Sequence, residues 1–150
     1  MSGEPRVLIV EDNDVLRAML FTILRHQPIG VDTAATGEEA FRKVLQCDYA
    51  LIVIDADMAH QACEKFVRRF REERPEATTF VLAVRDPKNE YHLAADLFSA
   101  VLNKPLEIDM LAEVVRETAA VVPQPEDPLP CPPAESDIRT KLERGPWLAN

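Results

Sequence analysis

Short apolar runs rich in β-branched residues alternate along this chain with longer segments of helical periodicity. Five of these runs predict strands, namely Arg6–Val10, Val31–Ala35, Ala50–Ile54, Thr79–Val84 and Ala100–Leu102. The intervening segments predict five helices. The first runs from Asp14 to before Pro28, and the second begins at Gly37. The other three are Gln61–Arg74, Asn89–Phe98 and Ile108–Val121. Alternation of strand and helix with short connections is typical of an α/β fold, in which helices cover both faces of a parallel sheet.

The composition changes abruptly after Val122. Six prolines fall within residues 123–133, and proline can neither donate a backbone hydrogen bond nor continue a helix. We therefore expect one domain in residues 1–122, followed by a solvated, disordered Pro-rich tail in residues 123–150. Residues 136–144 are expected to form two helical turns only by docking on a partner or a second copy, and an inert tail is the alternative.

The net charge, the apolar content and the cysteine spacing disfavour several classes of protein. A formal net charge of -9 disfavours binding to nucleic acid or to anionic membranes, because both need clustered Lys and Arg. The chain has neither a signal-peptide pattern at its start nor an apolar run of about 18 residues, so we expect no membrane partner and a cytoplasmic protein. Three widely spaced cysteines, Cys47, Cys63 and Cys131, form no C-x-x-C pair, which predicts free thiols.

Acidic residues follow two of the predicted strands directly. Glu11 and Asp12 come after the first strand and Asp55 after the third, and Lys104 lies in an Asn-Lys-Pro segment after the fifth. The carboxyl ends of parallel strands share one edge of a sheet, where ligands bind in open α/β folds. Three carboxylates at that edge predict a site for a hard divalent cation, with one lysine to balance the charge. This is the outline of a phosphoryl-transfer site.

These motifs, in this order, make residues 6–121 resemble the receiver domain of two-component response regulators. The opening strand with Glu11 and Asp12, the Asp-x-x-Met at Asp55, and the Lys-Pro at Lys104 match the family pattern. The resemblance implies a flavodoxin-like fold with three α/β/α layers and a doubly wound, five-stranded parallel sheet of strand order 2-1-3-4-5.

The resemblance also implies a function. Asp55 would accept a phosphoryl group from a sensor histidine kinase or a histidine phosphotransfer protein. Glu11, Asp12 and Asp55 would hold Mg²⁺ together with a backbone carbonyl near Asp57, and Lys104 would pair with Asp55 and later with the phosphoryl group. The protein would then act on a downstream protein target, alone or as a homodimer. It would be a phosphoacceptor that assists its own phosphotransfer, not a conventional enzyme.

The sequence departs from the family at the positions that couple phosphate to the distant surface. The Thr or Ser at the end of strand four is replaced by Ala83, or by Val84 if the register shifts by one. Val84 would also narrow access to Asp55, and Val101 replaces the aromatic residue three before the lysine. The alternative function is therefore a pseudo-receiver scaffold that binds partners independently of phosphorylation. A flavodoxin-type cofactor protein is disfavoured, because the acids after strand one would repel phosphate.

Two further residues near Asp55 offer weaker chemistry. Asp57 is a poor competitor as phosphoacceptor, because it lies two residues past the strand end. His60 has no second ligand at metal-binding spacing, so we expect an exposed loop histidine.

Overall fold

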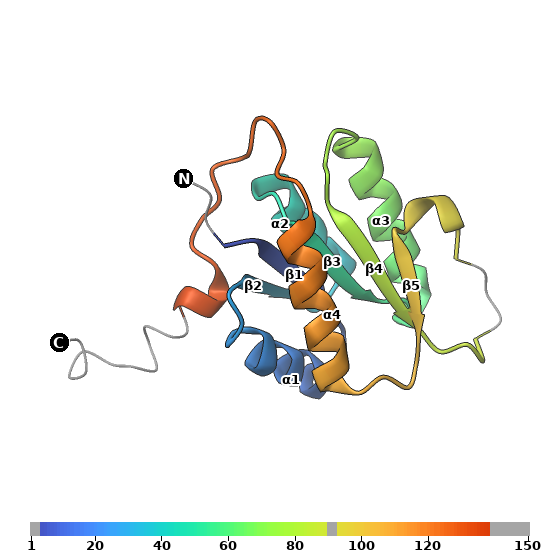
Figure 1. The fold of residues 1–150 in the computed structure, drawn as a ribbon. Coiled ribbons are helices and arrows are strands. Elements are labelled where there is room, and N and C mark those ends of the chain that lie inside the picture. The colour runs from blue at the N-terminus through green and yellow to red at the C-terminus, as the bar shows by residue number, and fades with distance from the viewer. Residues whose placement is uncertain (1–3, 90–92, 139–150) are drawn as a thin grey trace.

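The computed structural model describes residues 4–89 and 93–138 and has the predicted α/β architecture (Figure 1). Its strands are β1 (Arg6–Val10), β2 (Gly30–Ala34), β3 (Leu51–Asp55), β4 (Phe80–Arg85) and β5 (Ala100–Asn103). Its α-helices are α1 (Asp14–Leu24), α2 (Gly37–Gln46), α3 (Ala62–Glu73) and α4 (Ile108–Val121). All strand pairs are parallel and the order is β2-β1-β3-β4-β5, which confirms the predicted topology.

Helices cover both faces of this sheet. Alternate residues of the central strands point to opposite sides, so Ile52 and Ile54 pack in a core with α2 and α3, whereas Leu51 and Val53 pack in a core with α1 and α4. The central strands β1 and β3 are therefore apolar on both faces, as buried parallel strands are. The two cores leave the carboxyl edge of the sheet free to carry polar groups.

The helix predicted for residues 89–98 is wrong for residue 89 and residues 93–98, whereas residues 90–92 lie outside the described residues. Residues 93–94 have no regular structure and Ala95–Leu97 form only a short 3₁₀ turn, η2. Before them the chain turns at Asp86, whose Oδ1 accepts from the Lys88 N–H at 2.9 Å and whose carbonyl accepts from the Asn89 N–H at 3.0 Å. Side-chain and backbone bonds of this kind compete with helix formation, and the turn ties the loop to the site described below.

The expectation of a solvated tail is corrected for residues 129–138. Leu129 N–H donates to Asp48 Oδ2 at 2.6 Å, Ala134 and Ser136 are buried, and residues 135–138 form a helical turn beside β2. The polar side chains of this segment find partners on the edge strand, an arrangement that proline content alone cannot reveal. The remainder of the predicted 136–144 helix, from residue 139, lies outside the described residues.

The prediction of three free thiols is wrong for two of them. Cys47 and Cys131 form a disulfide with a Cα–Cα distance of 4.7 Å, while Cys63 is free and buried. The two partners are 84 residues apart, and only the return of the tail to the sheet brings them together. Within the described part of the chain, no helix combines the length and the apolar character needed to cross a bilayer.

Candidate functional site

The three predicted acidic residues converge at the carboxyl edge of the sheet. Because β1 and β3 are neighbours in register, with Val10 opposite Ile54, the residues that follow them lie side by side. One carboxylate oxygen from each of Glu11, Asp12 and Asp55 lies within 4.8 Å of the others. Glu11 is buried, Asp55 is half-buried and Asp12 is exposed, so the group opens to solvent on one side.

Lys104 reaches this group from the carboxyl end of strand β5. Its Nζ lies 2.8 Å from Asp55 Oδ1 and 2.9 Å from Asp57 Oδ2, and it is held in place by a backbone bond from Lys104 N–H to the Arg85 carbonyl. Burial disfavours the charged ammonium, but hydrogen bonds and charge from the two aspartates outweigh burial and raise the pKa of Lys104. The lysine therefore stays charged beside Asp55.

Asp57 has a structural role that the sequence analysis did not identify. Its carboxylate accepts hydrogen bonds from the Asp86 N–H, at 2.8 Å, and from the Asn89 side chain. Burial raises the pKa of Asp57, but the bond from Lys104, followed by those from Asp86 and Asn89, lowers it overall. The Asp57 side chain thus anchors the lysine and the β4–β5 loop, and its carboxylate is not part of the three-residue acidic group. The signal available in the sequence was the Asp-x-x-Asn at residues 86–89.

Glu11 is the most perturbed acid of the site. Burial is the main cause that raises its pKa to about 8; neighbouring Asp55 adds to the rise, and the Asn13 N–H, which donates to Glu11 Oε2 at 3.1 Å, opposes it. A cation bound between these oxygens would favour the ionised form of Glu11. Clustered carboxylate oxygens, one exposed to solvent, are the donor set that Mg²⁺ prefers, so the residues present fit this metal.

The end of strand β4 lies one residue further along than the sequence predicted. Val84, not Ala83, is opposite Asp55, and the strand ends at Arg85. Ala83 pairs with Ile54 and is fully buried in the core shared with α2 and α3, so it does not occupy the strand end. Val101 is 42% exposed on the edge strand β5.

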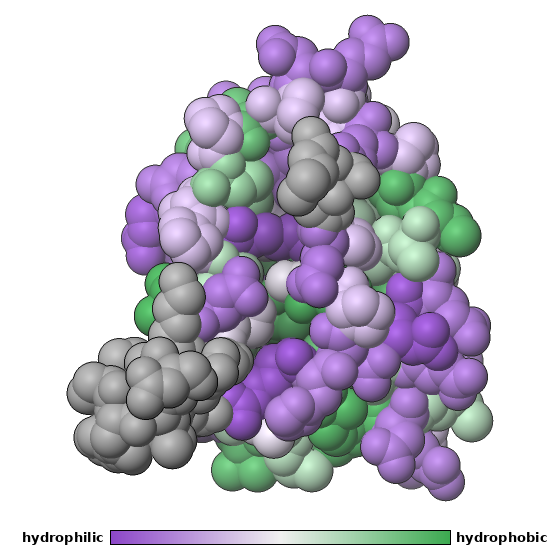
Figure 2. All heavy atoms as spheres, turned by 60° about the vertical axis from the view of Figure 1, so that its left-hand side comes forward, coloured by the Kyte–Doolittle hydropathy of each residue, from purple (hydrophilic) through white to green (hydrophobic). Residues whose placement is uncertain are grey.

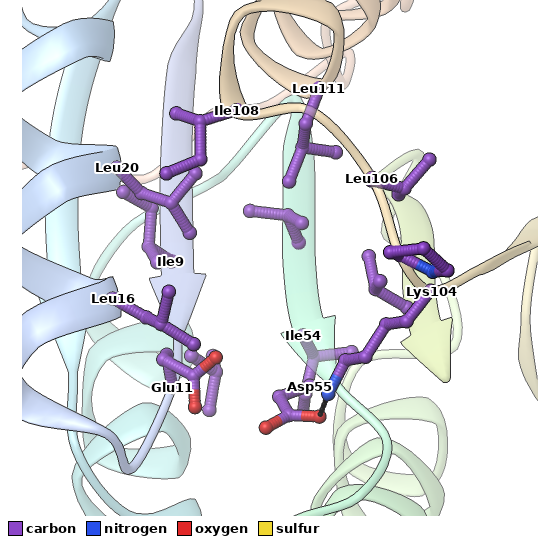
Figure 3. A pocket seen from close by; sticks show the side chains of 14 residues that line it. Ile9, Glu11, Leu16, Leu20, Ile54, Asp55, Lys104, Leu106, Ile108 and Leu111 are labelled. Carbon is purple, nitrogen blue, oxygen red and sulfur yellow. Dashed lines mark hydrogen bonds and ion pairs between the residues drawn. The ribbon is translucent and has the colours of Figure 1, made fainter. Parts of the chain in front are cut away.

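An apolar cavity of about 310 Å³ adjoins the acidic group between α1 and α4 (Figure 3). Leu16 and Leu20 of α1 face Ile108 and Leu111 of α4 across it, and the Lys104 side chain extends to Asp55 at its end. Val84 lines the same cavity. The apolar wall lowers the local dielectric on one side of the carboxylates, which strengthens the ion pair between Lys104 and Asp55.

The loop that follows Asp55 has an unusual backbone. His60 and Gln61 have positive φ angles of 60° and 56°, in the left-handed region that favours glycine. His60 is exposed, as predicted. Two residues on, burial is the main cause that raises the pKa of the Cys63 thiol to about 12, so this cysteine is a packing residue and not a nucleophile.

A family model that spans the site and a relative of known name match this chain. The family model described as the response regulator receiver domain matches residues 7–116. The transcriptional regulatory protein ResD of Bacillus subtilis is 30% identical over 73 residues, a match that spans 49% of this chain and 30% of ResD.

Solved structures are similar in fold over most of the chain. The chemotaxis response regulator CheY4 of Vibrio cholerae has a TM-score of 0.67 at 23% identity, covering 77% of this chain and 98% of its own. Response regulator TrrA of Thermotoga maritima, solved in complex with Mg²⁺ and BeF, has a TM-score of 0.64 at 23% identity, covering 76% of this chain and 98% of its own. At these identities the structures establish the fold.

Proposed function

This chain belongs to the response regulator receiver domain family, and we propose that it accepts a phosphoryl group on Asp55 with the help of Mg²⁺. Receiver domains are phosphoacceptor modules of two-component signalling and not conventional enzymes, and they bind Mg²⁺ and interact with histidine kinases. The observation that carries the proposal is the acidic group of Glu11, Asp12 and Asp55, with Lys104 Nζ 2.8 Å from Asp55 Oδ1.

The proposed reaction assigns a separate task to each residue. An oxygen of Asp55 attacks phosphorus; the bond from phosphorus to the donor's imidazole nitrogen breaks, and the phosphoryl group is left on Asp55 as an acyl phosphate. Glu11, Asp12 and Asp55, with a backbone carbonyl near Asp57, would hold Mg²⁺, which supplies neutralising charge on the transferring group. Lys104 stays an ammonium, and its bond passes from Asp55 to a phosphoryl oxygen.

The partners of this site follow from the proposal. The donor is a sensor histidine kinase or a histidine phosphotransfer protein in the cytoplasm, and the phosphorylated domain acts on a downstream protein, as a monomer or a homodimer. The net charge of -9 argues against nucleic acid as that target.

A phosphorylation-independent scaffold is the second candidate, and the end of strand β4 favours it. None of Ala83, Val84 and Arg85 carries a hydroxyl to bond a phosphoryl oxygen, and Val101 takes the place of the aromatic switch residue. A missing hydrogen bond to a charged group is worth about 1.5–3 kcal/mol, whereas reversing a two-state equilibrium from 1:99 to 99:1 needs about 5.5 kcal/mol. A receiver altered in this way would transmit phosphorylation weakly.

Intact-mass measurement distinguishes the two candidates. With Mg²⁺ and an acyl phosphate donor, we expect wild type to gain one phosphoryl group, slowly because Val84 lies opposite Asp55. Asp55→Asn should gain none, while the matched control Asp109→Asn, an exposed acid in the first turn of α4, should behave as wild type. If wild type stays unmodified after prolonged exposure, the scaffold function replaces the phosphoacceptor function.

A further inference from the structure

The tail segment of residues 129–138 covers the open edge of strand β2, and we propose that the Cys47–Cys131 disulfide makes this cover a redox-controlled clasp. An uncovered edge strand presents free backbone N–H groups to other chains. Here side chains of the tail satisfy those groups: the Val31 N–H donates to Ser136 Oγ at 2.9 Å and the Thr33 N–H donates to Glu135 Oε1 at 2.9 Å. The tail therefore satisfies two donors of the edge strand that a sixth strand would otherwise satisfy.

Three charged residues of the domain, Asp32, Lys43 and Arg6, also contact the tail segment, and Arg6 does so by donating to the Pro132 carbonyl. The Glu135 N–H donates to Oδ1 of the buried Asp32 at 2.8 Å, while Oδ2 of Asp32 is bound by Arg6 and by the Tyr49 hydroxyl. Lys43 of helix α2 forms an ion pair with Glu135 at 2.6 Å. Every one of these contacts is polar and could be replaced by water, so noncovalent attraction alone holds the segment only moderately.

The surroundings of the tail support this assignment. The side of the molecule that carries the tail in Figure 1 comes forward in Figure 2, where hydrophilic residues predominate and hydrophobic ones form separate small areas. Ala134 is the one buried apolar side chain among residues 129–138. It packs against Gly30, where a Cβ added to the glycine would lie only 3.2 Å from the Ala134 Cβ. Because little apolar surface is buried, the covalent bond carries much of the attachment.

The disulfide is placed where a thiol reductant can open it. Cys131 is exposed, whereas Cys47 lies buried at the end of helix α2. A thiolate RS⁻ attacks Cys131 Sγ, the Sγ–Sγ bond breaks, and Cys47 leaves as a thiolate that takes up a proton. A second RSH then releases Cys131, so that two thiols are oxidised to RSSR and the protein disulfide is reduced to two thiols. Exchange with RSSR reverses the change.

Release of the clasp would free two backbone donors and one oxygen of a buried acid. It would also uncover the side of helix α1 next to Glu135 and Ile138, which together with Ala18, Phe21 and Thr33 line a shallow depression. The described hydrogen bonds and ion pairs of Glu11, Asp55 and Lys104 do not involve residues 129–138, so release of the clasp leaves these contacts in place. The clasp is thus a second input, separate from the acidic site.

Amide hydrogen exchange of the full chain tests this directly. We expect Val31 and Thr33 to exchange at least tenfold faster after reduction with dithiothreitol than in the oxidised protein, while Phe80, whose N–H donates to Ala50 within the sheet, keeps its rate. Cys131→Ser should exchange like the reduced protein without any reductant. The matched control Cys63→Ser lacks the free buried thiol and should respond to dithiothreitol as wild type does.

Two results would overturn the clasp. Equal exchange at Val31 and Thr33 in oxidised, reduced and Cys131→Ser protein would mean that the tail stays bound without the disulfide. A mass consistent with two unlinked cysteines after incubation with oxidised glutathione would mean that the bond does not form. Neither measurement depends on phosphorylation of Asp55.

Discussion

At the scale of single residues, the ends of strands β1 and β3 bring Glu11 and Asp55 together, and their packing raises the pKa of Glu11. The end of a buried parallel strand fixes where Glu11 and Asp55 lie, because strand register is set by the apolar pattern. The raised pKa of Glu11 depends on burial and on the distance to Asp55, which only the packed structure supplies. The partners of Asp57 were missed for the same reason, because Asn89 is brought to it by a loop expected to be a helix.

Magnesium binding should strengthen as the pH rises toward 8. Burial raises the pKa of Glu11 to about 8, so below that pH its carboxyl carries a proton that Mg²⁺ must displace. Proton linkage then predicts an apparent affinity that increases by up to about tenfold per pH unit between pH 6 and pH 8 and levels off above. Calorimetric titration with MgCl₂ across this range measures it. Glu11→Gln, which cannot ionise, should bind more weakly and show no such slope; a wild-type affinity independent of pH would contradict the prediction.

The left-handed backbone at Gln61 predicts a stabilising substitution. A side chain in this region costs about 1 kcal/mol, which exceeds the extra chain entropy that glycine loses on folding. We expect Gln61→Gly to raise the free energy of unfolding by about 0.5 kcal/mol in urea denaturation. Ala59→Gly, two residues earlier and without a positive φ, is the matched control and should lower it by a similar amount. Stabilisation by both changes, or by neither, would show that the backbone at Gln61 is not strained.

At the scale of elements, the strong periodic patterns predicted the strands and helices correctly. The end of strand β4 and the weakly periodic segment after it were predicted wrongly. The run of residues 79–84 predicted β4, but its last residue is Arg85, because pairing with Asn103 of β5 extends the strand by one position. The segment 89–98 contains enough apolar residues for a helix, yet a turn at Asp86 precedes it and its described residues 93–98 form only the short η2 segment. Local hydrogen bonds determine both the end of strand β4 and the conformation after Asp86, and these bonds cannot be inferred from a hydrophobic pattern.

The corrected end of β4 predicts where a hydroxyl would assist the site. The family places its Thr or Ser at the end of this strand, which is Arg85. Arg85→Thr is therefore expected to speed phosphorylation by an acyl phosphate several-fold in intact-mass kinetics. Ala83→Thr, the matched change two positions earlier, puts a hydroxyl into the fully buried core and should cost about 1–3 kcal/mol of stability with no gain in rate. A faster reaction in Ala83→Thr alone would restore the register predicted from the sequence.

At the scale of the whole molecule, the parallel sheet and its two cores followed from the sequence, but the path of the tail did not. Six prolines predict an extended chain, and the chain is indeed non-helical from residue 123 to residue 134. Extended segments still find partners: the Thr78 hydroxyl donates to the Pro123 carbonyl at 2.7 Å, and Asp48 accepts from the Leu129 N–H. Contacts between residues some 80 to 105 positions apart leave no local signal in the sequence, which is why both the docked tail and its disulfide were missed.

Truncation of the chain after Val122 should therefore destabilise the domain, contrary to what the proline content suggests. It removes the disulfide partner of Cys47 and leaves Oδ1 of the buried Asp32 without the Glu135 N–H. Loss of a disulfide that closes a long loop typically costs 2–5 kcal/mol, so we expect a decrease of about that size in the free energy of unfolding under oxidising conditions.

Truncation after Ile138 keeps every described contact and separates the effect of residues 129–138 from that of residues 139–150. The difference between the two truncations should become small in dithiothreitol, because reduction opens the disulfide and releases the contacts of Glu135 and Ser136 in the longer chain. Urea denaturation of both in each redox state measures it, and equal stability of the two under oxidising conditions would show that the tail contributes nothing to the fold.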